Sequence, residues 1–207
     1  MRKPFWLIDG KLCEADFFLE KLRNAPDLDD ARYYFSAFIS AARSVTYALQ
    51  VCLRGFRDFD AWYEERQQEL RDHPIARHFH TLRNQVIHQA LNPLGRQLRF
   101  HLGSQFFIEG EGVPEKDAVV AASAYMAALV RIAREAYQRF WSSLDLPRDL
   151  TPDGLAAQGR TIEDIEDEFG LPCGWSGGEN VTPQMRIDRM KWFSSTEIQR
   201  LSTRYPS

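Results

Sequence analysis

The sequence predicts an all-α fold, a helical bundle built from long antiparallel helices. Apolar residues recur at every third or fourth position through most of residues 12–144, as they do on the buried face of a helix. The 207 residues, of which 44% are hydrophobic, can bury a core without disulfides or metals. Pro and Gly divide this region into segments of helical length. Together these observations favour one helical domain with an appendage.

Two helices should open the chain. The first has its apolar repeat over residues 12–22 and ends before Pro26. The second should begin near Asp27 or Asp29, because acidic side chains stabilise the N-terminal end of a helix. Its apolar stripe continues to about Leu53, which predicts a helix of unusual length.

Two shorter helices should follow. Residues 58–71 are rich in Glu and Arg around Trp62, so we expect a mainly solvated helix. The next helix should cover residues 75–91, whose apolar side chains are again three or four positions apart. Pro74 fits its first turn, where no backbone donor is required.

The second half of the chain changes character twice. Alternating apolar and polar residues predict a short β-hairpin near 96–108. Residues 114–144 should form the central helix, since the run from 118 to 133 is apolar on most sides. Beyond Pro147 the sequence is rich in Gly, Pro and charge. We therefore expect a bundle over 1–147 and an accessory arm over 148–207, packed on the bundle or on a partner.

The charge and cysteine content restrict the function only broadly. With 26 basic and 29 acidic residues the net charge is −3, so any nucleic-acid binding must depend on local basic clusters. The three cysteines lack metal-site spacing and are typical of a reducing compartment. No signal-like or membrane-spanning stretch is present in this sequence. We therefore expect a cytoplasmic protein with no membrane segment, cofactor or metal.

The most informative segment is Arg83-Asn84-Gln85-Val86-Ile87-His88. It resembles the signature of the HEPN family, in which an Arg, often followed by a polar residue, precedes a His by five to seven positions. Such a match is expected by chance about 0.06 times in a chain of this composition. The looser form also fits Arg96 to His101, but there Gln97 follows the Arg.

The resemblance implies a metal-independent endoribonuclease, a toxin of a toxin–antitoxin or phage-defence system. On this hypothesis the RNA 2′-hydroxyl attacks the adjacent phosphate and leaves a 2′,3′-cyclic phosphate. His88 would move protons, Arg83 would stabilise the charged transition state, and Asn84 would orient His88 or the phosphate. The implied partners are RNA, a second copy of the chain with the motif at the interface, and an antitoxin protein.

Several alternatives remain open. Arg77, His78 and His80 could extend an RNA-binding surface or could be ordinary surface residues near a helix start. His88 could be a hydrogen-bonded structural residue. The whole protein could be a non-catalytic HEPN-type binding or dimerisation module. It could also be a helical protein without a nucleic-acid role, if Arg83 is used in an internal salt bridge.

Overall fold

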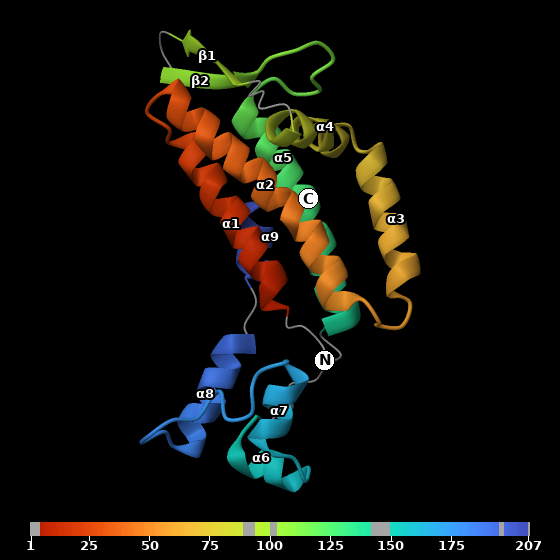
Figure 1. Cartoon of the computed structure of the whole chain (residues 1–207), viewed down its shortest axis with the longest axis vertical. Coiled ribbons are helices and arrows are strands. Elements are labelled where there is room, and N and C mark those ends of the chain that lie inside the picture. The colour runs from red at the N-terminus through yellow and green to blue at the C-terminus, as the bar shows by residue number, and fades with distance from the viewer. Residues whose placement is uncertain (1–4, 89–93, 100–102, 142–149, 195–196, 207) are drawn as a thin grey trace.

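The computed structural model of the chain is a helical bundle with a β-hairpin at one end and a small helical lobe beyond the other (Figure 1). The structure describes residues 5–88, 94–99, 103–141, 150–194 and 197–206. The predicted all-α class is confirmed, since the strands in these residues form a single two-stranded sheet. None of the described helices combines the length and hydropathy that a bilayer span requires.

Helices α1 (Trp6–Arg23) and α2 (Leu28–Leu53) pack side by side along the bundle (Figure 1). The carboxylate of Asp27 caps α2 by accepting a hydrogen bond from the backbone N–H of Asp30 at 2.9 Å. This start and the end at Leu53 agree with the prediction. Helix α1 begins earlier than expected, because Ile8 is fully buried although charged neighbours interrupt the apolar repeat there.

Helix α3 (Phe59–Asp72) is less solvated than its sequence indicated. Only 4% of Trp62 is exposed, and its ring packs edge-to-face on Phe140 with the ring centroids 5.2 Å apart. The expectation of a mainly solvated helix was therefore wrong at Trp62. Its apolar partner comes from a distant part of the chain, which local periodicity does not register. Helix α4 (Pro74–His88) starts at the predicted proline.

The predicted hairpin is confirmed as β1 (Leu94–Arg99) and β2 (Gly103–Ile108), which pair antiparallel. Leu94 and Ile108 face each other in the register and are both fully buried, so their side chains attach the hairpin to the bundle. Helix α5 (Ala118–Ala136) follows, starting four positions later than expected, and continues into a π-helical turn, η1 (Tyr137–Trp141). The buried face of α5 packs against α1, α2 and α4, as expected for a central helix.

Three short helices form the lobe: α6 (Pro152–Ala157), α7 (Ile162–Glu168) and α8 (Pro183–Ser194). Glu166 is fully buried and holds the loop between α7 and α8. Its carboxylate accepts hydrogen bonds from the backbone N–H groups of Gly174 at 2.6 Å and Ser176 at 2.7 Å. Arg186 adds a contact at 3.3 Å. This buried charge is therefore well compensated.

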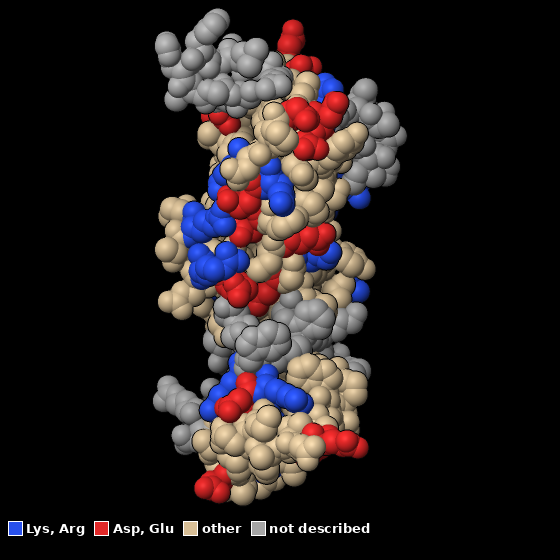
Figure 2. Space-filling model, turned by 90° about the vertical axis from the view of Figure 1, so that its left-hand side faces the viewer, with Lys and Arg blue, Asp and Glu red and all other residues tan. Residues whose placement is uncertain are grey.

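Helix α9 (Ile198–Arg204) returns to the bundle and packs on α5. Asp16 of α1 fixes its end, accepting a 2.6 Å hydrogen bond from the hydroxyl of Tyr205 and contacts from Arg200 and Arg204. Burial and this hydrogen bond raise the pKa of Tyr205. Figure 2 shows a face of the bundle on which Lys and Arg alternate with Asp and Glu. The basic residues Arg200 and Arg204 of α9 form ion pairs within the chain, since both contact Asp16.

Candidate anion-binding site

A cavity of about 410 Å³ lies where α2, α3, α4 and α5 meet. Its size falls in the range of about 300–1,000 Å³ that is usual for small-ligand sites. None of the described residues that line it carries a carboxylate, whereas several carry a positive charge or a hydroxyl group. The lining residues are Arg43, Thr46, Tyr63, Gln67, Leu70, Arg71, Ala76, Arg77, His80, Thr81 and Tyr125. We call this cavity the arginine pocket.

The turn between α2 and α3 opens the space for the pocket. Asp58 adopts a left-handed backbone conformation there, with φ of 64°, and α3 then runs at a distance from α2 (Figure 1). Tyr63 bridges the two helices near the pocket. Its hydroxyl donates to the backbone carbonyl of Thr46 at 3.1 Å and accepts from Gln50 Nε2 at 3.0 Å. These bonds fix the wall of the pocket between α2 and α3.

The three arginines of the pocket have neutral partners or none. Arg43 donates to the hydroxyl of Thr46 on the same helix. Arg71 donates through Nε and Nη2 to Gln68 Oε1, at 3.0 and 2.9 Å. Within the described ranges, Arg77 makes no side-chain hydrogen bond and none of the three forms an ion pair. The pocket therefore concentrates positive charge, which attracts anions.

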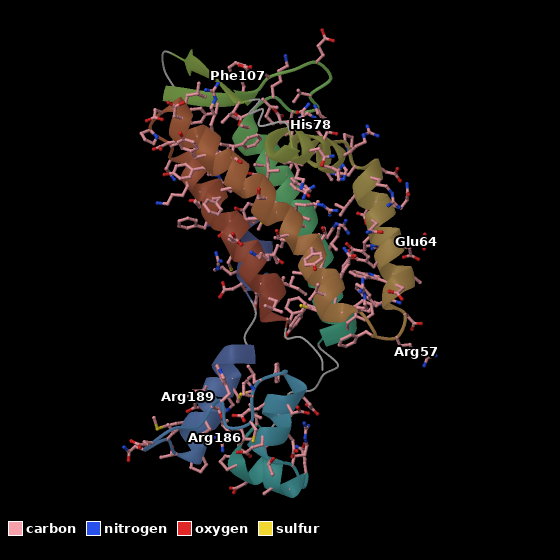
Figure 3. All side chains as sticks on the ribbon, in the orientation of Figure 1. Arg57, Glu64, His78, Phe107, Arg186 and Arg189 are labelled. Carbon is pink, nitrogen blue, oxygen red and sulfur yellow. The ribbon has the colours of Figure 1, made fainter. Side chains whose placement is uncertain are left out.

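The acidic residues of α3 lie elsewhere. Glu69 forms an ion-pair network with Arg66, Arg131 and Glu135, in which Arg66 Nη1 and Arg131 Nη1 lie 2.8 and 2.7 Å from the Glu135 carboxylate. Glu64 projects from the outer side of α3, away from the bundle (Figure 3). Although α3 is acidic overall, its carboxylates do not neutralise the pocket.

Tyr125 of α5 is one of the most buried polar residues of the pocket. Only 6% of it is exposed, and its ring stacks on Phe79 with the centroids 4.8 Å apart. Burial raises the pKa of Tyr125 to about 12, although the nearby charge of Arg43 acts in the opposite direction. The hydroxyl therefore keeps its proton at neutral pH and can donate a hydrogen bond.

The structure brings two of the predicted RNA-binding residues into the pocket and separates the third from it. Arg77 and His80 line the cavity and are exposed to it. His78 is half-buried elsewhere on α4 (Figure 3). Its buried Nε2 has no hydrogen-bond partner among the described residues, and burial lowers its pKa. Its contribution to an RNA-binding surface stays a prediction.

The predicted catalytic residues lie beyond the pocket at the C-terminal end of α4. Arg83 Nη1 is 3.5 Å from Asn84 Oδ1, which is a long contact. Asn84 is exposed, and its spacing of seven from Arg77 puts both on one face of the helix. His88 is the last residue of α4, but its side chain is outside the described residues. The predicted convergence of Arg83 and His88 thus stays a prediction.

Sequence reasoning missed Arg43, Arg71, Tyr63 and Tyr125. One local signal was available at Arg43, because a charged residue there follows the buried Ala42 within the apolar stripe of α2. The sequence around Tyr63 and Tyr125 predicts ordinary core positions for both.

The fold and the pocket define a class: an all-α helical bundle with a cationic ligand pocket. Residues 3–130 match the family described as Bacteriophage lambda protein ea47. The match spans more than half of the chain, so the chain belongs to this family. It covers every residue that lines the arginine pocket. No curated protein and no solved structure matches the chain.

This family assignment corrects the resemblance to the HEPN family, which was wrong. The family that matches is that of Bacteriophage lambda protein ea47. The resemblance depended on a short pattern, Arg83-Asn84 followed by His88, within a generic arrangement of long helices. A pattern that fixes only three residues carries a false-positive risk in any helical sequence.

Proposed function

We propose that the protein binds RNA, with one phosphate and its nucleotide entering the arginine pocket. The observation that carries this proposal is the convergence of Arg43, Arg71 and Arg77 in a cavity without a lining carboxylate. Guanidinium groups hold phosphate oxygens through paired N–H donors, which makes Arg suitable for nucleic-acid backbones. A net charge of −3 does not oppose this, because the charge that acts on the ligand is local.

Other features of the pocket support RNA as the ligand. The imidazole of His80 is exposed at the pocket, and such rings can stack on unpaired bases. Gln67 and Thr81 supply neutral polar groups that can exchange hydrogen bonds with a 2′-hydroxyl. The cavity has room for a nucleotide but not for a duplex, so the proposed ligand is single-stranded.

Binding can be tested by fluorescence anisotropy with a labelled single-stranded RNA, its DNA counterpart and an RNA duplex. We expect the single-stranded RNA to bind most tightly. With one phosphate neutralised in the pocket, log affinity should fall with log salt concentration with a slope of about −0.7. Arg77→Gln should weaken binding about tenfold. The control is Arg57→Gln, which removes the same charge from an exposed residue at the α2–α3 corner (Figure 3). Equal affinities of the two variants would contradict the proposal.

RNA cleavage is the second candidate function. It is favoured by the contact between Arg83 and Asn84, which lie on α4 just beyond the pocket residues Arg77 and His80. RNA held in the pocket could pass this end of the helix. His88 would take the proton of the 2′-hydroxyl, the new bond to phosphorus would form a cyclic phosphate, and the departing 5′-oxygen would be protonated.

Cleavage is tested by incubating purified protein with mixed RNA in EDTA and analysing the product ends. We expect 2′,3′-cyclic phosphate products that are lost in Arg83→Ala and His88→Ala. Arg57→Ala is the control for a surface arginine. RNA that binds but stays intact would overturn cleavage and leave the binding proposal in place. The predicted second copy of the chain and the antitoxin also stay predictions, and sedimentation of the same samples would reveal a homodimer.

A further inference from the structure

Tyr125 is the most unusual polar group in the arginine pocket. More than nine-tenths of it is buried, yet its hydroxyl makes no hydrogen bond with any described residue. The residue lines the pocket, and its hydroxyl is not among the fully enclosed polar atoms of the described residues that lack a partner. The hydroxyl therefore reaches the cavity, where a ligand atom can accept its hydrogen bond.

Two neighbouring hydroxyls of the pocket make their hydrogen bonds elsewhere. The hydroxyl of Tyr63 donates to the carbonyl of Thr46 and accepts from Gln50. The hydroxyl of Thr46 donates to the carbonyl of Arg43 at 2.9 Å and accepts from the Arg43 guanidinium. Neither is bonded to Tyr125, whose hydroxyl is therefore an open donor near the charge of Arg43.

The number of charges in the pocket exceeds what an internal phosphodiester needs. Such a group carries one negative charge and two non-bridging oxygens, whereas Arg43, Arg71 and Arg77 supply three positive charges. A phosphate monoester carries nearly two negative charges at neutral pH and offers three terminal oxygens. The monoester therefore matches both the charge and the number of donors better than the diester does.

The shape of the pocket favours a chain end. Tyr125 belongs to the central helix α5 and, together with Tyr63, is buried against the core, so these two residues close the inner side of the cavity. A continuing nucleic-acid strand needs an exit as well as an entrance. A terminal phosphate needs only the entrance that the exposed Arg71, Arg77 and His80 surround.

We infer that the arginine pocket recognises a terminal phosphate monoester, held by Arg43, Arg71 and Arg77 and by a hydrogen bond from the Tyr125 hydroxyl. This inference rests on the proposed RNA binding and names the part of the RNA that enters the pocket. The same chemical group occurs at a 5′ end, at a 3′ end and in a free nucleoside monophosphate. The experiment must therefore separate these sources.

The test compares the affinity of the full chain for one single-stranded RNA with a 5′-phosphate, a 3′-phosphate or hydroxyls at both ends, and for a nucleoside monophosphate as competitor. We expect one phosphorylated end to bind at least about tenfold more tightly than the hydroxyl-ended RNA. The end that gains affinity identifies the source. If the nucleoside monophosphate binds as tightly as the phosphorylated RNA, the ligand is a free nucleotide. The inference that the pocket recognises a phosphate monoester would then still stand.

Tyr125→Phe is the decisive variant, because it removes only the hydroxyl and keeps the ring that stacks on Phe79. It should reduce affinity for the phosphorylated end several-fold more than affinity for hydroxyl-ended RNA, so that the preference for the phosphorylated end falls. Its melting temperature without ligand should be equal to or above that of the wild type, since no hydrogen bond among the described residues is lost. A purely structural hydroxyl would instead lower the melting temperature and leave the preference intact.

The failures of the two proposals can be told apart. Equal affinity for phosphorylated and hydroxyl-ended RNA would overturn the monoester inference, while RNA binding would stand. No binding of any RNA at low salt, together with no binding of the nucleoside monophosphate measured directly by calorimetry, would overturn both. Loss of the end preference in Arg43→Gln but not in Arg57→Gln would support the inference, since both variants remove one arginine charge.

Discussion

Arginines are used differently in two regions that lie next to each other along α3. In the ion-pair network, Arg66 and Arg131 contact the carboxylates of Glu69 and Glu135 and so connect α3 to α5. In the arginine pocket, Arg43, Arg71 and Arg77 face a cavity that no carboxylate lines. The two regions meet on α3, but the network arginines are partly buried beside carboxylates, whereas the pocket arginines are exposed and have no carboxylate beside them among the described residues.

The difference shows how a charged residue can be assigned to folding or to binding. An arginine that already contacts a carboxylate gains little from a phosphate, because it must first give up that partner. An arginine without a carboxylate keeps its charge available to a ligand. Holding three such charges together costs some stability, and sites that do so are common where function requires them. The predictions below test this distinction.

The largest effect should come from the lobe, where a paired carboxylate is fully buried. Glu166→Gln should destabilise the lobe by about 3 kcal/mol, because Arg186 and the backbone donors of Gly174 and Ser176 lose their charged acceptor. Faster hydrogen exchange at the Gly174 and Ser176 amides should reveal this destabilisation. Glu163→Gln is the matched control, since Glu163 also contacts Arg186 but is partly exposed, unlike the fully buried Glu166. Unchanged exchange at both amides would contradict the prediction.

The same carboxylate makes stability depend on pH. Burial tends to raise the pKa of Glu166, but hydrogen bonds from Ser176, Gly174 and Arg186 lower it below its ordinary value of 4.5. A depressed native pKa stabilises the fold above the unfolded pKa, and this contribution is lost as the pH falls through the native value. Denaturation between neutral and acidic pH should show this loss in the wild type and a smaller one in Glu166→Gln.

The second largest effect should appear in ligand binding. Replacing both Arg43 and Arg77 by Gln should weaken RNA binding by about 2–3 kcal/mol, since each removes a charge-assisted hydrogen bond. Binding isotherms at constant salt measure this, with Arg57→Gln as the control. The salt dependence should become shallower as well. A variant that binds as the wild type does would place the RNA elsewhere on the protein.

A smaller effect is expected for the ion-pair network. Arg131→Gln should lower stability by about 1 kcal/mol, because Glu69 and Glu135 are partly buried and each loses one cation. Urea denaturation measures this difference. RNA affinity should stay within error of the wild type once the protein is folded. A clear loss of affinity would mean that the network also carries the ligand and would remove the distinction between the two regions.

The smallest effect should have the opposite sign. Arg77→Gln should stabilise the ligand-free protein by about 0.5 kcal/mol at low salt, because it relieves repulsion from Arg43 and Arg71. High salt should remove the gain through screening. Thermal melts at two salt concentrations measure it. Destabilisation at low salt would indicate that Arg77 contributes to folding.

The sequence by itself determined most of the secondary structure. Asp27 capped a helix that ended at Leu53, Pro74 opened another, and the alternation near 96–108 gave a hairpin. These features depend on interactions between residues close in the chain, such as caps, turns and the period of apolar side chains. The same local reasoning found Arg77 and His80 as candidate ligand contacts, which the structure places in a pocket.

Only the tertiary structure decided what those helices build. It buried Trp62 against Phe140 and brought Arg43, Arg77 and Tyr125 from three separate helices to one cavity. The short motif at Arg83 suggested a family that the match of residues 3–130 replaced. Local periodicity predicts which face of a helix is apolar but not which distant residue packs against it. The charge of the pocket comes from such long-range packing, which places arginines of separate helices around one cavity.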